Sequence, residues 1–129
     1  MKHNNIGLYI VTLTNEVPIS VNAHDPRLAE KAIKVNKSNL KFGKAKDFDL
    51  RKKNYFKTFG EANVNFRPFI AMDEIDLAEK LILKNLDPYR VRGNTGKKNE
   101  WLTGITVSQL EKVILDTLQK ENLKFALIK

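Results

Sequence analysis

Short strand-like segments alternate with amphipathic helical segments along the whole chain, and this alternation restricts the fold more than any other feature. Residues 6–13 are rich in β-branched side chains, and in both 6–13 and 64–71 side chains alternate in the way that is typical of half-buried strands. Residues 108–122 instead carry apolar side chains at helical spacing. The order of segments predicts an α+β fold, a small mixed sheet covered by helices.

Local signals give the expected bounds of the other elements. A further strand is predicted over 39–43, with a shorter one over 17–21, and residues 88–100 read as a polar loop. Helices are predicted from Pro26 to about Asn36, from an Asp47 N-cap to about Tyr55, and from Asp73 or Asp76 to just before Pro88.

Two details of these elements are specific enough to test. Pro68 within the strand 64–71 predicts an edge position or a bulge, and simple alternation puts Val64, Phe66 and Ile70 on one face. In the last helix, Ser108 is predicted to form a capping box with Glu111.

The chain length and the absence of cysteine limit the class of protein. With 129 residues we expect one domain over 1–129 with one core. The lack of cysteine excludes a disulfide framework, a zinc ribbon and a thiol nucleophile, and it favours a reducing, cytoplasmic setting. No apolar run is long enough for a membrane span, and no signal peptide is evident.

The net charge of +8 is concentrated in one part of the chain. Residues 37–57 contain eight lysines and arginines against two aspartates, a net charge of +6. A second basic concentration lies within 84–98. Such localised charge predicts a polyanion as partner, and a solvated surface is the alternative.

Common hydrolase motifs are absent from the sequence. There is no nucleophile elbow, phosphate-binding loop or dinucleotide-binding glycine pattern. His3 and His24 are expected in the N-terminal tail and in a turn, which argues against a histidine-based mechanism.

Several short motifs together resemble the GIY-YIG nuclease superfamily. They are Gly7-Leu8-Tyr9, Lys41-Phe42-Gly43, Lys44-Ala45-Lys46-Asp47-Phe48, then Arg51, Tyr55 and Glu79. The run from Gly43 to Arg51 is similar to the nuclease module of the bacterial excision-repair incision subunit and to phage GIY-YIG homing endonucleases. Asn99-Glu100-Trp101-Leu102 resembles an element of a phage-associated branch.

The resemblance implies a small, mainly antiparallel three-stranded sheet flanked by helices, and it implies a role for each matched residue. Glu79 would hold one Mg²⁺ or Mn²⁺ ion, and Arg51 would bind phosphate oxygens with its planar donors. Tyr9 would act as general base or orient the attacking water, with a phenol pKa lowered by Lys44 and Lys41. Tyr55 would hydrogen-bond the scissile phosphate or the water. Because Arg51 and Tyr55 are four residues apart, they share a helix face.

Each of these residues also has an ordinary structural alternative. Tyr9 could be a half-buried strand residue, Glu79 a solvent-facing helix residue and Trp101 a core anchor, and Glu100 could pair with a cation. The sequence departs from the motif at Lys41, which replaces the second tyrosine. Relative to that family, the segment at about 21–37, between the first two motifs, is an expected insertion, which could contact DNA or a partner or could serve packing only.

The resulting hypothesis is a metal-dependent endonuclease that hydrolyses phosphodiester bonds of DNA, most simply double-stranded. The expected nucleic-acid-binding residues are the remaining basic ones near the motifs, Lys37, Lys46, Lys52, Lys53, Arg90, Arg92, Lys97 and Lys98. One alternative is a non-catalytic nucleic-acid-binding module on the same fold. Another is a protein interaction domain whose basic face meets an acidic protein.

Overall fold

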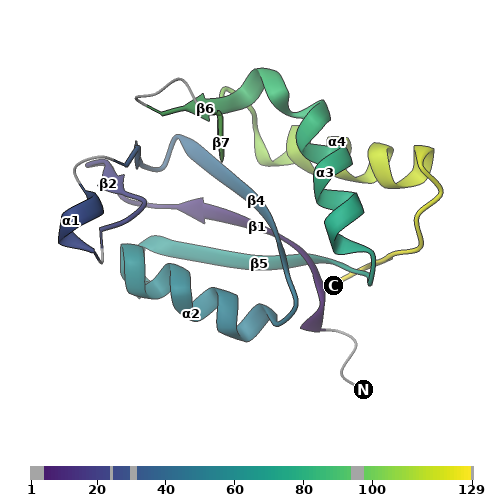
Figure 1. Ribbon diagram of the computed structural model, residues 1–129, viewed down its shortest axis with the longest axis horizontal. Coiled ribbons are helices and arrows are strands. Elements are labelled where there is room, and N and C mark those ends of the chain that lie inside the picture. Colours follow the sequence, from purple (N-terminus) through teal and green to yellow (C-terminus); the bar gives the residue numbers. More distant parts are fainter. Residues whose placement is uncertain (1–4, 24, 30–31, 94–97, 129) are drawn as a thin grey trace.

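The computed structural model describes residues 5–23, 25–29, 32–93 and 98–128 (Figure 1). Its centre is a six-stranded antiparallel sheet in the order β6-β7-β4-β1-β5-β8. The strands are β1 (Gly7–Leu13), β4 (Asn39–Ala45), β5 (Val64–Ala71), β6 (Arg90–Arg92), β7 (Lys98–Thr103) and β8 (Ala126–Leu127). The α+β class is confirmed, but the expected three strands are too few.

Helices cover both faces of this sheet. Helix α2 (Phe48–Phe59) lies on one face, while α3 (Ile75–Asn85) and α4 (Val107–Lys120) lie together on the other (Figure 1). Short 3₁₀ turns, Glu61–Asn63 and Asp87–Tyr89, follow α2 and α3. Within the described residues no helix is long and apolar enough to cross a membrane.

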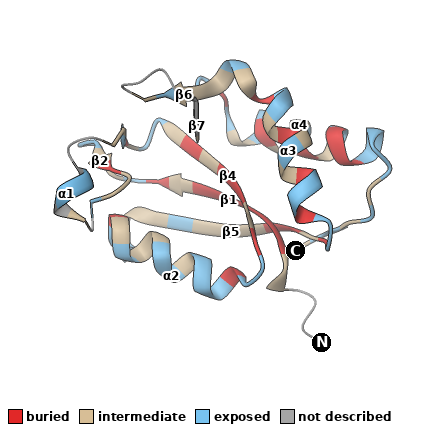
Figure 2. Ribbon diagram, in the orientation of Figure 1, coloured by how far each residue is buried: buried red, intermediate tan, exposed pale blue. Residues whose placement is uncertain are grey.

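The sheet separates two apolar clusters, where one core was expected. Leu8, Ile10 and Phe42 point toward α3 and α4, whereas Tyr9 and Val11 point toward α2. Strand β1 is therefore buried along nearly its whole length, while α2 exposes its outer side (Figure 2). Alternate side chains of one central strand thus serve both clusters, as the pleat of a strand requires.

The expected polar loop at 88–100 instead contributes two strands. Arg90–Arg92 pairs with Lys98–Thr103, and β7 continues onto β4 with Lys41 opposite Trp101. Charged side chains hide the apolar alternation by which a strand is recognised in a sequence. Backbone pairing, with Trp101 and Leu102 buried on opposite faces, determines the structure here.

A bulge in β5 changes which face its side chains occupy. Leu8 pairs with Ile70 but Tyr9 pairs with Pro68, so one extra residue, Phe69, lies on β5. The bulge at Pro68 is confirmed, but the single face predicted for Val64, Phe66 and Ile70 is wrong. Phe66 packs on the α2 side and Ile70 on the α3 side, because a one-residue shift reverses the direction of every later side chain.

The predicted helix over 26–36 is also wrong in its extent. Among the described residues of this segment, helix α1 covers Pro26–Ala29, while Lys34–Val35 forms the strand β3, which pairs with β2 (Ile19–Ser20) in a small hairpin. Val35 is 1% exposed and belongs to the α2-side cluster. Burying this β-branched side chain favours a strand over continued helix.

The caps of the helices follow the sequence in one case and not in the others. Asp47 caps α2 as predicted, accepting hydrogen bonds from the backbone amides of Asp49 and Leu50. Helix α3 begins after Glu74 without a side-chain cap. Helix α4 begins after Thr106, which forms the capping box with Gln109. Ser108 and Glu111 therefore do not cap this helix.

Candidate functional site

The candidate site lies where the edge of β4 is left open by β7. Within the described residues, the pairing of β4 with β7 runs from Asn39 to Lys41 only. Beyond that point, side chains of α2 and α3, which cover opposite faces of the sheet, lie around the same stretch of β4. Side chains of both faces can therefore meet around the strand.

Five elements contribute side chains to a hollow of about 280 Å³ at this edge. We call it the carboxylate hollow, and it is lined by Tyr9, Lys41, Lys44, Arg51, Glu79 and Glu100. Five of the six residues predicted to be catalytic are thus brought together. The sixth, Tyr55, is joined to Tyr9 by a hydrogen bond between the two hydroxyls at 2.7 Å.

Gly43 allows Tyr9 to reach this position. A Cβ atom at Gly43 would lie 2.4 Å from the Tyr9 hydroxyl oxygen and 2.5 Å from its ring carbon Cζ. The ring therefore crosses β4 where only glycine leaves room. On its other side it stacks on Phe66, with ring centroids 4.6 Å apart. The phenol is held between the sheet and α2.

The electrostatics of Tyr9 contradict the expected lowering of its pKa. Burial raises the pKa of the Tyr9 phenol to about 12, although its hydrogen bond with Tyr55 and the charge of Arg51 act in the opposite direction. Burial also raises the pKa of Tyr55 well above its usual range. Both phenols are therefore neutral near pH 7. In this environment Tyr9 can donate or accept a hydrogen bond but is not an ionised base.

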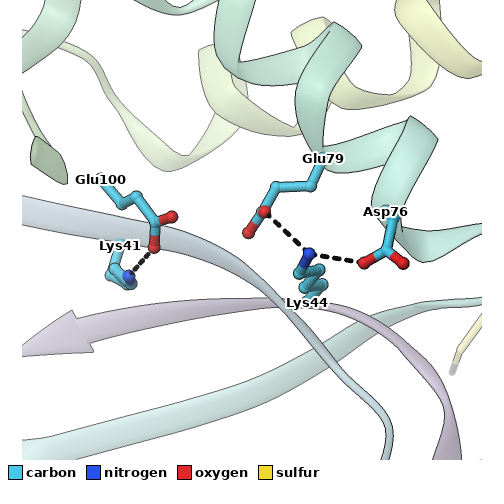
Figure 3. Close-up of polar contacts among 5 residues, drawn as sticks. All are labelled: Lys41, Lys44, Asp76, Glu79 and Glu100. Carbon is cyan, nitrogen blue, oxygen red and sulfur yellow. Dashed lines mark hydrogen bonds and ion pairs between the residues drawn. The ribbon is translucent and has the colours of Figure 1, made fainter.

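Two lysines of β4 hold the acidic groups of the hollow (Figure 3). The Lys41 ammonium donates to Glu100 Oε1 at 2.6 Å. The Lys44 ammonium donates to Asp76 Oδ1 at 2.5 Å and lies 3.4 Å from Glu79 Oε1. Figure 3 shows the Glu79 and Glu100 carboxylates on the same side of β4, reaching toward one gap from α3 and β7.

The two glutamates differ in how easily they ionise. Burial raises the pKa of the Glu79 carboxyl, and the negative charge of Glu100 raises it further. Burial also acts to raise the pKa of Glu100, but the charge and hydrogen bond of Lys41, with smaller contributions from Arg90 and Lys44, lower it overall. The carboxylates are thus close enough to influence each other.

This pair suits a magnesium-like ion better than a metal held entirely by protein. No group of three or more metal-ligating side chains occurs in the part of the chain that the structure describes. Mg²⁺ commonly uses one or two carboxylates and completes its shell with water and substrate phosphate. Glu79 and Glu100 provide that number of carboxylates in one hollow.

The predicted nucleic-acid-binding residues are more widely distributed. Lys46 lines a separate hollow between α2 and α3, beside Lys44 and Arg51, and Lys52 lies over the Phe56 ring at 5.9 Å. Lys53 is exposed on α2. Lys37 lies outside the hollow and faces Glu16 at 3.9 Å.

The other basic residues belong to the β6–β7 region. Arg90 and Arg92 are in β6, and Arg90 acts electrostatically on Glu100. Lys98 begins β7. Lys97, like His3 and His24, lies outside the described residues.

Two acidic residues of the site were not predicted to have these roles. Glu100 was expected in a loop, where pairing with a cation was only one alternative, and Asp76 was considered only as a helix cap. The neighbouring Trp101, 4% exposed, fixes the strand that carries Glu100. Trp101 is a core residue, as its structural alternative predicted.

The chain belongs to the T5orf172 domain family, since the model of that family matches residues 20–118. No curated protein and no solved structure shows significant similarity to it.

This match overturns the resemblance to the GIY-YIG superfamily, because it assigns the chain to a different family. Gly7-Leu8-Tyr9, the first motif of the resemblance, lies before the matched range. A few spaced residues describe the chemistry of a site, whereas a family model compares the sequence over most of its length.

Proposed function

We propose that this protein is a divalent-metal-dependent endonuclease that hydrolyses phosphodiester bonds in DNA. The observation that carries the proposal is the carboxylate hollow, in which two glutamates lie among Lys41, Lys44 and Arg51. Acidic groups for a cation and basic groups for a phosphate are both needed for this reaction. A purely basic surface would lack the carboxylates for the cation, and a purely acidic surface would lack the basic groups for the phosphate.

The basic residues have the geometry to hold a phosphate. Arg51 is exposed on α2 at the mouth of the hollow, and its planar guanidinium can donate to two phosphate oxygens at once. Lys41 and Lys44 supply compact positive charges from β4. Such contacts stabilise the charge that develops on phosphorus during hydrolysis.

The acidic residues would hold the metal ion. Glu79 would be one ligand, with Glu100 as the second carboxylate of the hollow. A bound Mg²⁺ or Mn²⁺ supplies charge neutralisation and lowers the pKa of a coordinated water. The neutral Tyr9 hydroxyl, linked to Tyr55, would orient a water by hydrogen bonding rather than remove its proton.

The ion pairs leave Glu79 able to change partners. Lys44 is closer to Asp76, at 2.5 Å, than to Glu79, at 3.4 Å. When Glu79 turns to a cation, Lys44 keeps Asp76 as its partner. Metal binding by Glu79 would therefore leave Lys44 paired with Asp76.

The test is cleavage of supercoiled plasmid DNA with Mg²⁺ or Mn²⁺. Glu79→Gln keeps the shape of the side chain but removes its charge, and we expect nicking to fall by 100-fold or more, on the order of the loss seen for a single charge-stabilising group. Glu74→Gln is the matched control, because Glu74 is an exposed acid just before α3 that makes no capping bond. Equal cutting by Glu79→Gln and wild type, or cutting in EDTA, would contradict the proposal.

A non-catalytic DNA-binding module is the second candidate. The observation that favours it is that each glutamate already has a lysine partner, so the charges of the hollow are balanced without a metal. In that case the protein would shift DNA in a gel but leave a wide panel of substrates intact with either metal.

A further inference from the structure

A second hollow adjoins the carboxylate hollow and shares two of its basic residues. It has a volume of about 250 Å³ and is lined in part by Lys41 and Arg51. These same side chains also line the carboxylate hollow. A phosphate held by Arg51 would therefore lie on the boundary between the two hollows.

The wall of this second hollow, which we call the aromatic hollow, is unlike that of the first. Tyr55, Phe59 and Trp101 contribute three rings. Tyr55 and Phe59 are stacked with centroids 6.5 Å apart, and Trp101 meets Phe59 edge-on at 5.5 Å. Phe59 and Trp101 are 5% and 4% exposed, so only small parts of these rings reach the hollow, and the half-buried Tyr55 ring offers the apolar surface that a planar heterocycle can contact.

Polar groups stand at the rim of the aromatic hollow. Asn54 and Thr58 lie on successive turns of α2 and both line it. An amide offers both donors and an acceptor, which is what the hydrogen-bonding edge of a base requires. Val21, from the segment before α1, closes another side. The segment between β1 and β4 thus contributes to a hollow as well as to packing.

The size of the hollow suits one heterocycle. Its volume of about 250 Å³ is just below the roughly 300–1,000 Å³ of sites for drug-sized ligands. A base paired within a duplex is stacked on both sides and cannot enter such a recess. Only an unpaired or extruded base can enter the hollow. The free energy needed to extrude a base is lowest where its pairing is already lost.

We infer that the aromatic hollow receives the base of an unpaired DNA nucleotide next to the phosphate held by Arg51. The site would then favour bulged, mismatched or single-stranded positions over regular duplex. This inference rests on the proposed action on DNA and specifies its substrate class. It requires the two hollows to work together, since a base and its phosphate are separated only by a sugar.

The test measures binding in EDTA, so that it does not depend on cleavage. Fluorescence anisotropy would compare a labelled duplex carrying one unpaired thymine with the same duplex carrying an abasic spacer there. We expect wild type to bind the thymine duplex at least about 5-fold more tightly, as stacking of one base on aromatic side chains implies. Thr58→Leu fills the hollow and should bring this ratio below about 2-fold.

Two further variants make the result interpretable. Gln119→Leu places the same side chain on an exposed position of α4 and should keep the wild-type ratio. Asn54→Ala, at an exposed position of α2, should also reduce the ratio. It serves as the test variant if Thr58→Leu does not fold.

The outcomes separate this inference from the proposed function. Equal affinity of wild type for the two duplexes, no binding of either, or an unchanged ratio in both Thr58→Leu and Asn54→Ala would overturn it. A protein that cuts plasmid but ignores the unpaired base would keep the endonuclease proposal and lose this one. If the protein never cuts DNA but shows the expected affinity ratios, the inference on the unpaired base stands and the endonuclease proposal is lost.

Discussion

Tyr9 shows how the surroundings of one residue change its chemistry. Its side chain is 2% exposed, packed on Phe66 and bonded to Tyr55. The sequence indicated correctly that it lies near lysines and Arg51. It could not indicate the degree of burial, which outweighs those charges and raises the pKa of the phenol.

The raised pKa of Tyr9 predicts a loss of stability at high pH. The neutral phenol is favoured in the folded state, so its contribution to the free energy of unfolding is complete below pH 10 and is lost as pH rises toward 12. By about pH 11 we expect a loss on the order of 1 kcal/mol from this group. Urea unfolding of wild type and Tyr9→Phe at pH 8 and pH 11 would measure it. A pH dependence unchanged by the substitution would contradict the assignment.

Gly43 gives a second prediction at the residue scale. Gly43→Ala would place a Cβ atom 2.4 Å from the Tyr9 hydroxyl oxygen. We expect a loss of about 1–3 kcal/mol in the free energy of unfolding, as for other overpacked sites. In a Tyr9→Ala background the same change should have little effect, because the clashing ring is absent. Equal losses in both backgrounds would show that the ring is not the cause.

At the scale of elements, helix α4 begins two residues earlier than its sequence pattern suggested. Ser108 and Glu111 satisfy the capping-box pattern as well as Thr106 and Gln109 do. The local sequence therefore allows two registers, with the helix starting after Thr106 or after Ser108. Glu111 instead pairs with Arg67 of β5. This contact between helix and sheet is tertiary, and it accompanies the earlier start.

Two alanine substitutions distinguish these registers. Thr106→Ala removes the cap that accepts from the Gln109 amide and should lower the free energy of unfolding by about 1 kcal/mol. Ser108→Ala, at an exposed position inside the helix, should leave it unchanged or raise it slightly. Thermal or urea unfolding would measure both. The opposite ranking would show that Ser108 is the cap.

At the scale of the whole molecule, the sheet puts the basic segment and the last helix on different sides. Helix α2, which carries Arg51, Lys52 and Lys53, lies on one face of the sheet, and α4 lies on the opposite face (Figure 1). The positive charge concentrated in residues 37–57 thus gathers around β4 and α2. Binding of DNA should therefore depend on this side and not on α4.

The salt dependence of DNA binding tests this distribution. Affinity should fall steeply and linearly on a log–log plot against salt concentration. Arg51→Ala should reduce the slope by about 1, since one phosphate contact is lost. Lys112→Ala is the matched control, because Lys112 lies on α4 and pairs with Asp116. Equal changes in slope for the two variants would contradict binding through the α2 side.

The sequence by itself determined the main strands and helices, the Asp47 cap and the place of the basic segment. These follow from apolar spacing, local hydrogen bonding and charge, all of which act between near neighbours. It also selected most residues of the carboxylate hollow, although the family inferred from them was wrong.

Only the tertiary structure decided how the site is assembled and how its groups ionise. Charged strands such as β6 and β7 join the sheet through backbone pairing, which leaves little trace in apolar patterns. A one-residue bulge in β5 redirected later side chains, and burial reversed the expected pKa shift of Tyr9. Pairing, register and desolvation depend on residues far apart in the chain, and they brought Glu100 beside Glu79.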